Sequence, residues 1–110
     1  MKYGLSDAQL HEIINVLKQY PEIEKAILFG SRALNTFKEA SNVDIALIGK
    51  KINFMTAAHI KDELEEETYL PFFFDVIAYN SIDNEALKEH IRNFGIMIYE
   101  SRPKICKNPL

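Results

Sequence analysis

Hydrophobic residues recur along the chain at two spacings, one typical of amphipathic helices and the other of buried strands. The first helix is predicted to begin at Ser6, with Gln9 as its capping-box partner, and to end before Pro21. Its apolar positions fall on one face and are Leu10, Ile13, Ile14, Leu17 and Tyr20.

Two later segments have the same helical spacing. Residues 54–68 form one predicted helix, which Pro71 follows, and residues 84–94 form the other, with Asp83 as its cap and Gly95 at its end. The positions expected to face inward are Ala57, Ile60, Leu64, Leu87, Ile91 and Phe94.

Short apolar runs bounded by polar residues or glycine predict the strands. They cover residues 25–29, 43–48 and 72–79, and a shorter extended piece follows at 96–99. Because a buried strand needs apolar residues on both faces, core positions are expected for Phe72, Phe73 and Phe74. Strands that alternate with helices indicate an α/β fold (α+β in some schemes), with helices packed on a small, mostly mixed sheet of three to four strands.

Composition favours one cytoplasmic domain over residues 1–110, with 101–110 as a loose tail. The 110 residues, 47% of them apolar, fit a single globular core. No apolar run reaches the ~20 residues of a transmembrane helix, and no signal-peptide segment is visible. The net charge of −3 is spread along the chain without a basic face. We therefore expect neither a membrane nor a nucleic-acid partner, and the lone Cys106 is interpreted as a bystander thiol.

The first candidate site is the turn after the strand at 25–29. Gly30 and Ser31 lie between this strand and a segment that can begin a helix. Backbone N–H groups at such a turn bind anions, the Ser31 hydroxyl adds a donor, and Gly30 lets a phosphate approach the backbone. Arg32 can supply charge to a phosphate oxygen. The alternative, which these three residues taken alone would favour, is a tight turn with a solvated Arg32.

Two aspartates inside apolar strands form the second candidate site. Asp44 lies in Val-Asp-Ile-Ala-Leu-Ile and Asp75 in Phe-Phe-Asp-Val-Ile. Aspartate is unfavourable in strands and an unpaired buried carboxylate is costly, so the two carboxylates are predicted to converge on a cation. Mg²⁺ fits, because it takes a few carboxylates and completes its shell with water and phosphate oxygens. The alternative is that both side chains are solvated or paired with Arg32 or a lysine.

Together these elements resemble a known family. Gly30-Ser31, ten intervening residues, the pair Asn42-x-Asp44 and a later Asp75 are similar to the pattern of the minimal nucleotidyltransferases of the DNA polymerase beta superfamily. The resemblance extends over nearly the whole chain, and the further matching positions are Ala33, Ser41, Leu87, Ile91, Gly95 and Tyr99. It implies a nucleotidyltransferase-like fold.

The resemblance also implies an activity and a partner. The expected reaction moves a nucleoside monophosphate from an NTP, expected to be ATP, to an acceptor hydroxyl with Mg²⁺ or Mn²⁺. Gly30 and Ser31 would hold the β and γ phosphates, and Asp44 would bind metal. Asp75 would bind the second metal and act as the base or position it. The implied partner is a HEPN-type helical toxin, which such nucleotidyltransferases neutralise as antitoxins, in some cases by adenylylating a tyrosine.

The chain departs from the family pattern at two positions. Asn35 stands where glycine is frequent, and asparagine tolerates the left-handed conformation that the turn needs. Asn42 replaces the first acid of the metal-binding pair, which leaves a weak ligand and removes one negative charge. Two hypotheses stay open: an active transferase, or a catalytically weak or inactive nucleotide-binding antitoxin module that acts by binding its helical partner.

Other polar residues have simpler interpretations. None of the histidines has a partner at ligand spacing, so solvated imidazoles are expected for His11, His59 and His90. A solvated helix face is expected for Glu63, Glu65, Glu66 and Glu67.

Overall fold

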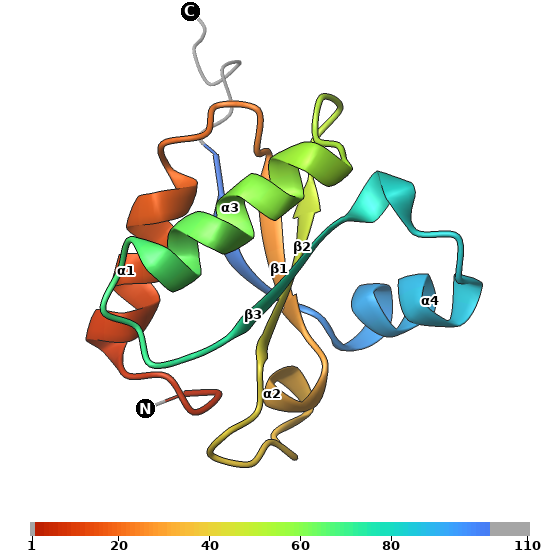
Figure 1. The fold of residues 1–110 in the computed structure, drawn as a ribbon. Coiled ribbons are helices and arrows are strands. Elements are labelled where there is room, and N and C mark those ends of the chain that lie inside the picture. Colours follow the sequence, from red (N-terminus) through yellow and green to blue (C-terminus); the bar gives the residue numbers. More distant parts are fainter. Residues whose placement is uncertain (1, 102–110) are drawn as a thin grey trace, which may run out of the picture.

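The computed structural model describes residues 2–101, and its helices and strands alternate along the chain (Figure 1). In chain order the elements are α1 (Asp7–Leu17), β1 (Lys25–Phe29), α2 (Ser31–Leu34), β2 (Val43–Ile48), α3 (Phe54–Glu66), β3 (Phe74–Ala78), the short 3-10 helix η1 (Tyr79–Ser81), α4 (Glu85–Phe94) and β4 (Ile96–Glu100). Cys106 and most of the predicted tail lie outside the described residues.

The four strands form one mixed sheet in the order β3-β2-β1-β4. β1 runs antiparallel to both β2 and β4, whereas β2 and β3 are parallel. A parallel pair needs a long connection, and α3 supplies it between these two strands. The predicted mixed sheet is therefore confirmed, and the short apolar piece at 96–99 is an edge strand.

Side-chain caps fix where the helices begin. Ser6 and Gln9 form the predicted capping box at the start of α1, with both reciprocal hydrogen bonds present. Asn53 caps α3 by accepting a hydrogen bond from the Thr56 N–H. The predicted cap of α4, Asp83, is wrong by one residue. Asn84 is the cap, and it accepts the hydrogen bond from the Leu87 N–H.

The two faces of the sheet are covered unequally. α1 and α3 pack on one face, where the main core contains alternate residues of each strand, such as Leu28, Ile45 and Val76. On the other face α4 covers a much smaller buried group, which consists of Phe29, Ala46 and Ile91. Because side chains alternate along a strand, Asp44 and Asp75 both belong to this thinly covered face.

Two of the aromatic residues assigned to the core are exposed. Phe74 is 1% exposed in the main core, but Phe73, just before β3, is 72% exposed, because alternation directs it to the opposite, thinly covered face. Phe94 is 53% exposed at the last turn of α4. The inward positions of α3 are buried as predicted: Ala57, Ile60 and Leu64.

Ser101, the last residue that the structure describes, is hydrogen-bonded to the segment just before β1. The Ser101 N–H donates a 2.9 Å hydrogen bond to the Glu24 carbonyl, which ties this residue to the start of β1. Across residues 2–101, no helix combines the length and apolar character needed to cross a membrane.

The exposure of the neighbouring phenylalanines leads to a stability prediction. Phe74→Ala should lower the free energy of unfolding by about 3–5 kcal/mol, because it empties a buried site in the main core. Phe73→Ala is the matched control and should change it by less than about 0.5 kcal/mol. Chemical denaturation of both variants checks this prediction. Equal losses of unfolding free energy would contradict the difference in burial between Phe73 and Phe74.

Candidate active site

Two carboxylates stand next to each other on the thinly covered face of the sheet. In the parallel pairing of β2 with β3, Asp44 is the register partner of Asp75. Neighbouring strands lie about 4.8 Å apart, so side chains that point to the same face at the same register come close together. The predicted convergence of these two side chains is therefore what the sheet register produces.

Gly30 forms the wall beside Asp44. It has a φ of 77°, a conformation that L side chains rarely adopt, and Phe29 just before it pairs with Asp44 across β1 and β2. A Cβ added at Gly30 would collide with the Asp44 carboxylate. The turn after β1 therefore requires glycine for two reasons, its backbone conformation and the close approach of a carboxylate oxygen.

Asn42 joins the carboxylates as a third polar group. Its Nδ2 donates a 3.0 Å hydrogen bond to Oδ2 of Asp75, and both side chains are exposed. Asn42 lies one residue before β2 and two residues before Asp44, so alternation along the strand places both side chains on the same face of the sheet. The position that the family pattern gives to an acid is thus held by a neutral donor.

The Asp44 carboxyl has a strongly perturbed pKa. Burial and the nearby Asp75 carboxylate together raise the pKa of Asp44 to about 6, and the Arg32 guanidinium partly opposes this rise. Two like charges held together on a half-buried surface favour either protonation or the binding of a cation. The electrostatics of this pair therefore suit a site that binds positive charge.

His90 is a site residue that the sequence reasoning missed. Its Nε2 accepts a 3.0 Å hydrogen bond from the Gly30 N–H, and its ring lies edge-on to Phe29 at 6.2 Å between centroids. The interpretation of His90 as a solvated imidazole was therefore wrong. Its position three residues after Leu87 places it on the inward side of α4, and that helical spacing was the available signal.

Arg32 does not extend toward the open side of the turn. The side chain is 1% exposed, and its guanidinium donates to the backbone carbonyls of Tyr3, Ser41 and Asn42. Burial lowers the pKa of Arg32, and the Asp44 carboxylate opposes this shift. The structure thus gives Arg32 contacts within the protein in place of the predicted contact with a phosphate, and it excludes a solvated Arg32 as well.

Asn35 adopts the backbone conformation that the turn requires. It follows α2 with φ 61° and ψ 31°, in the left-handed region. Glycine is the usual residue there, and asparagine is among the few others that tolerate it at small energetic cost. The replacement of glycine at this position therefore leaves the turn intact.

The oxygen atoms of this site suit a hard divalent cation. Asp44 and Asp75 offer carboxylate oxygens, and a half-turn of the Asn42 amide would offer a carbonyl oxygen in place of its nitrogen. Mg²⁺ binds such ligands and keeps water or phosphate oxygens in its other positions. Within residues 2–101, no group of three or more His, Cys, Asp or Glu side chains is placed to bind a metal, so the two carboxylates would share the cation with ligands of other kinds.

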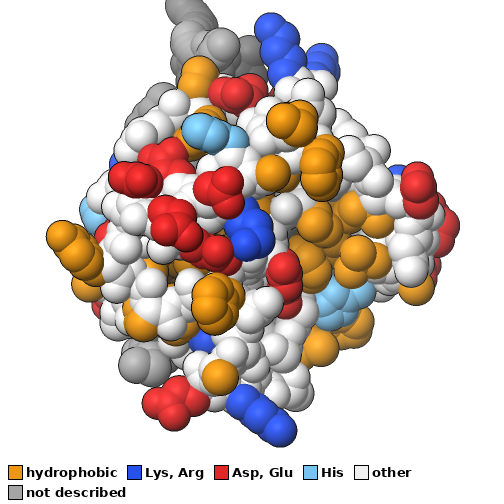
Figure 2. Space-filling view, viewed as in Figure 1, with side chains coloured by type: hydrophobic (Ala, Val, Ile, Leu, Met, Phe, Trp, Pro, Cys, Tyr) orange, Lys and Arg blue, Asp and Glu red, His pale blue; other side chains and the backbone are white. Residues whose placement is uncertain are grey.

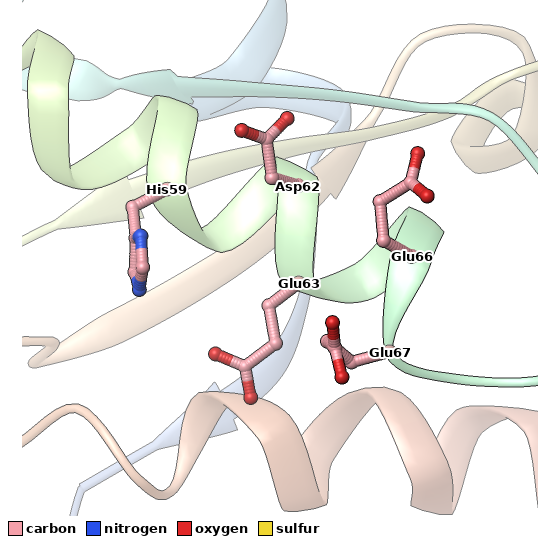
Figure 3. A pocket seen from close by; sticks show the side chains of 5 residues that line it. All are labelled: His59, Asp62, Glu63, Glu66 and Glu67. Carbon is pink, nitrogen blue, oxygen red and sulfur yellow. The ribbon is translucent and has the colours of Figure 1, made fainter.

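A second concave region lies on α3, on the opposite face of the sheet. This open pocket of about 540 Å³ is lined by side chains that project from α3 (Figure 3), namely His59, Asp62, Glu63, Glu66 and Glu67. Its position separates it from the carboxylate pair, because α3 packs on the main core.

The acidic face of α3 is only partly solvated, contrary to expectation. The Tyr20 hydroxyl donates a hydrogen bond to Glu63, and burial together with Glu63 raises the pKa of Tyr20 to about 12. Glu65 accepts a 2.7 Å hydrogen bond from the Phe74 N–H and pairs with Lys61 at 2.9 Å. These two glutamates attach α3 to the turn after α1 and to the start of β3.

The raised pKa of Asp44 predicts a pH dependence of stability. With a folded pKa of about 6 and an unfolded pKa of about 3.9, Asp44 takes up a proton on folding between these values, so stability falls as pH rises through this window. In a metal-chelating buffer at pH 8, Asp44→Asn should be more stable than the native chain by about 1–2 kcal/mol, a value reduced for solvent screening.

Thermal unfolding measured from pH 4 to pH 8 checks this prediction. The stability gain of Asp44→Asn should be largely lost at pH 4, where the carboxyl is protonated in the folded state and about half protonated in the unfolded state. Asp62→Asn, an exposed acid on α3, serves as control and should show no such gain. A pH-independent effect of Asp44→Asn would contradict the assigned pKa.

Comparisons with known proteins fit this geometry. The family model described as "Polymerase beta, Nucleotidyltransferase" matches residues 11–104. A protein of Methanocaldococcus jannaschii, named "Putative protein adenylyltransferase MJ0435", is 37% identical over 86 residues, which span 77% of this chain and 88% of that protein.

Solved structures share the fold at low sequence identity. A chain of a toxin–antitoxin complex with AMP-PNP superposes with a TM-score of 0.71 at 20% identity, over 84% of this chain and 74% of that one. A chain of a Shewanella oneidensis complex, a tri-AMPylated HEPN toxin with its MNT antitoxin, gives a TM-score of 0.64 at 18% identity, over 84% and 70%. The sheet and the paired aspartates thus occur in a chain that belongs to the polymerase beta nucleotidyltransferase family.

Proposed function

We propose that this nucleotidyltransferase moves AMP from ATP to a hydroxyl group of a helical partner protein, with Mg²⁺ or Mn²⁺ as cofactor. The observation that carries the proposal is the register of Asp44 with Asp75, beside a glycine turn that packs directly on Asp44. A pair of carboxylates next to a phosphate-sized turn is the arrangement that phosphoryl transfer requires.

Each residue of the site has a role in this reaction. The turn of Gly30 and Ser31 holds the β and γ phosphates of ATP, and Asp75 accepts the proton of the acceptor hydroxyl or positions that hydroxyl. The hydroxyl oxygen forms a bond to the α phosphorus, the bond from that phosphorus to the bridging oxygen breaks, and pyrophosphate leaves. Asp44, Asp75 and Asn42 would hold the divalent cation, which would supply positive charge for the phosphate oxygens.

The nucleotide is proposed to be ATP. The relative from Methanocaldococcus jannaschii has a name that specifies adenylyl transfer, and one structure of the same fold contains AMP-PNP, an ATP analogue. Both observations concern other proteins, and they support adenine over other bases here because one protein is a sequence relative and the other shares the fold.

The acceptor is proposed to be a tyrosine of a HEPN-type toxin, which would make this chain its antitoxin. A toxin modified with AMP occurs in one complex of the same fold. Next to the carboxylates, the sheet face leaves several apolar side chains only partly covered; Figure 2 shows hydrophobic residues gathered between β3 and α4. They include Ile27, Ile77, Tyr79, Ile82 and Leu87. Such a surface suits an apolar protein partner. We also propose that the reaction takes place in the cytoplasm.

A transfer assay tests this function. Purified chain, α-labelled ATP, Mg²⁺ and a HEPN-type helical protein should give a labelled partner whose modified tyrosine is found by mass spectrometry. Asp75→Ala should reduce the rate by at least about 100-fold, because general-base catalysis contributes that much or more. Asp62→Asn, on the other side of the sheet, should retain the native rate. Equal labelling by Asp75→Ala would contradict the role of Asp75.

A second function is favoured by one observation, the neutral amide that Asn42 presents to Asp75. Without the first acid the site has fewer negative charges to hold a cation. The chain would then bind nucleotide or partner without efficient turnover, and it would neutralise the toxin by covering its active site. This function and the first one share the fold, the turn and the partner surface.

The variant Asn42→Asp separates the two functions. In a chelating buffer it should be less stable by about 1–2 kcal/mol, because a donated hydrogen bond becomes a contact between two carboxylates. Added Mg²⁺ should raise its melting temperature more than that of the native chain, since the cation gains a charged ligand. A large gain in transfer rate would then assign the native chain to the binding function, and an unchanged or lower rate would assign it to the enzyme.

A further inference from the structure

Arg32 is the one charged side chain that is almost completely buried among the described residues. It is 1% exposed, and across residues 2–101 no carboxylate lies within ion-pair distance of it. A buried charge without a paired acid is costly unless hydrogen bonds replace its hydration. The contacts that do so show which parts of the chain depend on this cation.

The guanidinium contacts the loop that carries Asn42. Its Nη2 donates to the Ser41 carbonyl at 2.8 Å, and its Nε lies 3.3 Å from the carbonyls of Ser41 and Asn42. Asn42 in turn donates its side-chain hydrogen bond to Asp75. The cation therefore holds the backbone of the residue whose side chain completes the polar site.

Two phenylalanines enclose the same guanidinium. Its central carbon lies 5.1 Å from the centroid of Phe37, which belongs to that loop, and 4.8 Å from the centroid of Phe72. Phe72 lies on the segment that leads into β3 and Asp75. Cations at these distances from aromatic rings are attracted to the ring faces, and more strongly when they are shielded from water.

The N-terminal segment closes the remaining side. Nη1 of Arg32 donates a 3.0 Å hydrogen bond to the Tyr3 carbonyl, in a turn where Lys2 and Leu5 pair as a β-bridge. Tyr3 and Gly4 both have positive φ, 58° and 74°. A Cβ on Gly4 would collide with Nη1 of Arg32 and with the Phe37 ring. A tyrosine in a left-handed conformation indicates that this turn is maintained by the contact it makes.

We propose that Arg32 is a positioning residue, a buried clamp that fixes the loop of Asn42 and the approach to Asp75 relative to the phosphate turn, with the N-terminal turn as its cover. The clamp acts through Asn42 and Asp75 and not through contact with the substrate. The inference rests on the proposed function for its catalytic consequence, but the clamp itself is a structural property that can be measured without turnover.

A lysine cannot replace this arginine. The guanidinium uses three nitrogen atoms in separate directions, to Tyr3 on one side and to Ser41 and Asn42 on the other, and it stacks between two rings. A lysine ammonium has the same charge but lacks the planar fork that makes these contacts together. Arg32→Lys therefore keeps the charge near Asp44 and removes the geometry of the clamp.

The experiment compares two variants that weaken the clamp with one that does not. Arg32→Lys changes the guanidinium, and Gly4→Ala leaves Arg32 in place but forces a methyl group against it. Gly49→Ala is the matched control, because its added Cβ would collide with the Glu22 carbonyl, away from the clamp. The first readout is the side-chain NH₂ signal of Asn42 in a proton–nitrogen spectrum, which is assigned by its loss in Asn42→Asp.

Both clamp variants should shift the Asn42 NH₂ signal toward that of a free amide, while Gly49→Ala keeps it at the native position. The Mg²⁺ concentration for half-maximal transfer should rise by about 10–100-fold, as for other residues that orient metal ligands, with little change in the KM for ATP. An unchanged NH₂ signal in the clamp variants, or a raised KM for ATP with the native signal, would overturn the clamp in favour of direct phosphate contact.

The outcome does not depend on the transferase activity. If Arg32→Lys does not fold, the signal of Asn42 in Gly4→Ala and in the milder Phe37→Leu decides the matter. If no variant and not even the native chain transfers AMP, the proposed function fails, but the shift of the Asn42 signal still supports or removes the clamp. The two failures are therefore distinguishable.

Discussion

The parallel pairing of β2 with β3 holds two carboxylates side by side, and most of the active site is arranged around that constraint. Asp44 and Asp75 meet because they share a register, and their mutual repulsion, with burial, raises the pKa of Asp44 to about 6. Two neighbouring negative charges repel each other, so the rest of the sheet must be stable enough to hold the two carboxylates together. The main core under α1 and α3 provides that stability on the opposite face.

The neighbouring elements follow from the same pair. Gly30 must be glycine because the Asp44 carboxylate occupies the space of its missing Cβ, and His90 accepts the hydrogen bond of the Gly30 N–H from α4. Asn42 supplies a donor to Asp75 where an acid would add a third negative charge. This amide therefore avoids a third negative charge beside Asp75, and it offers a cation a weaker ligand than a carboxylate would.

The unequal cover of the two sheet faces also explains which residues are buried and which are exposed. The face covered by α1 and α3 buries alternate residues of β1, β2 and β3, whereas the face with the carboxylates has only α4 over it. The proposed reaction needs access for a nucleotide and a partner protein. The partly covered apolar residues on the face of Asp75 are compatible with that access.

The sequence by itself determined the elements and the candidate acids. Helical and strand periods predicted the mixed sheet, the capping box and the burial of α3, because local spacing decides which residues share a face. Asp44 and Asp75 were found because a charge inside an apolar strand is conspicuous. The tertiary structure alone decided the roles of Arg32, His90 and Phe73. The hydrogen-bond partners of Arg32 and His90 include residues far away in the sequence, such as Tyr3 and Gly30, so these contacts leave no local pattern. The exposure of Phe73 depends on which elements cover its face of the sheet.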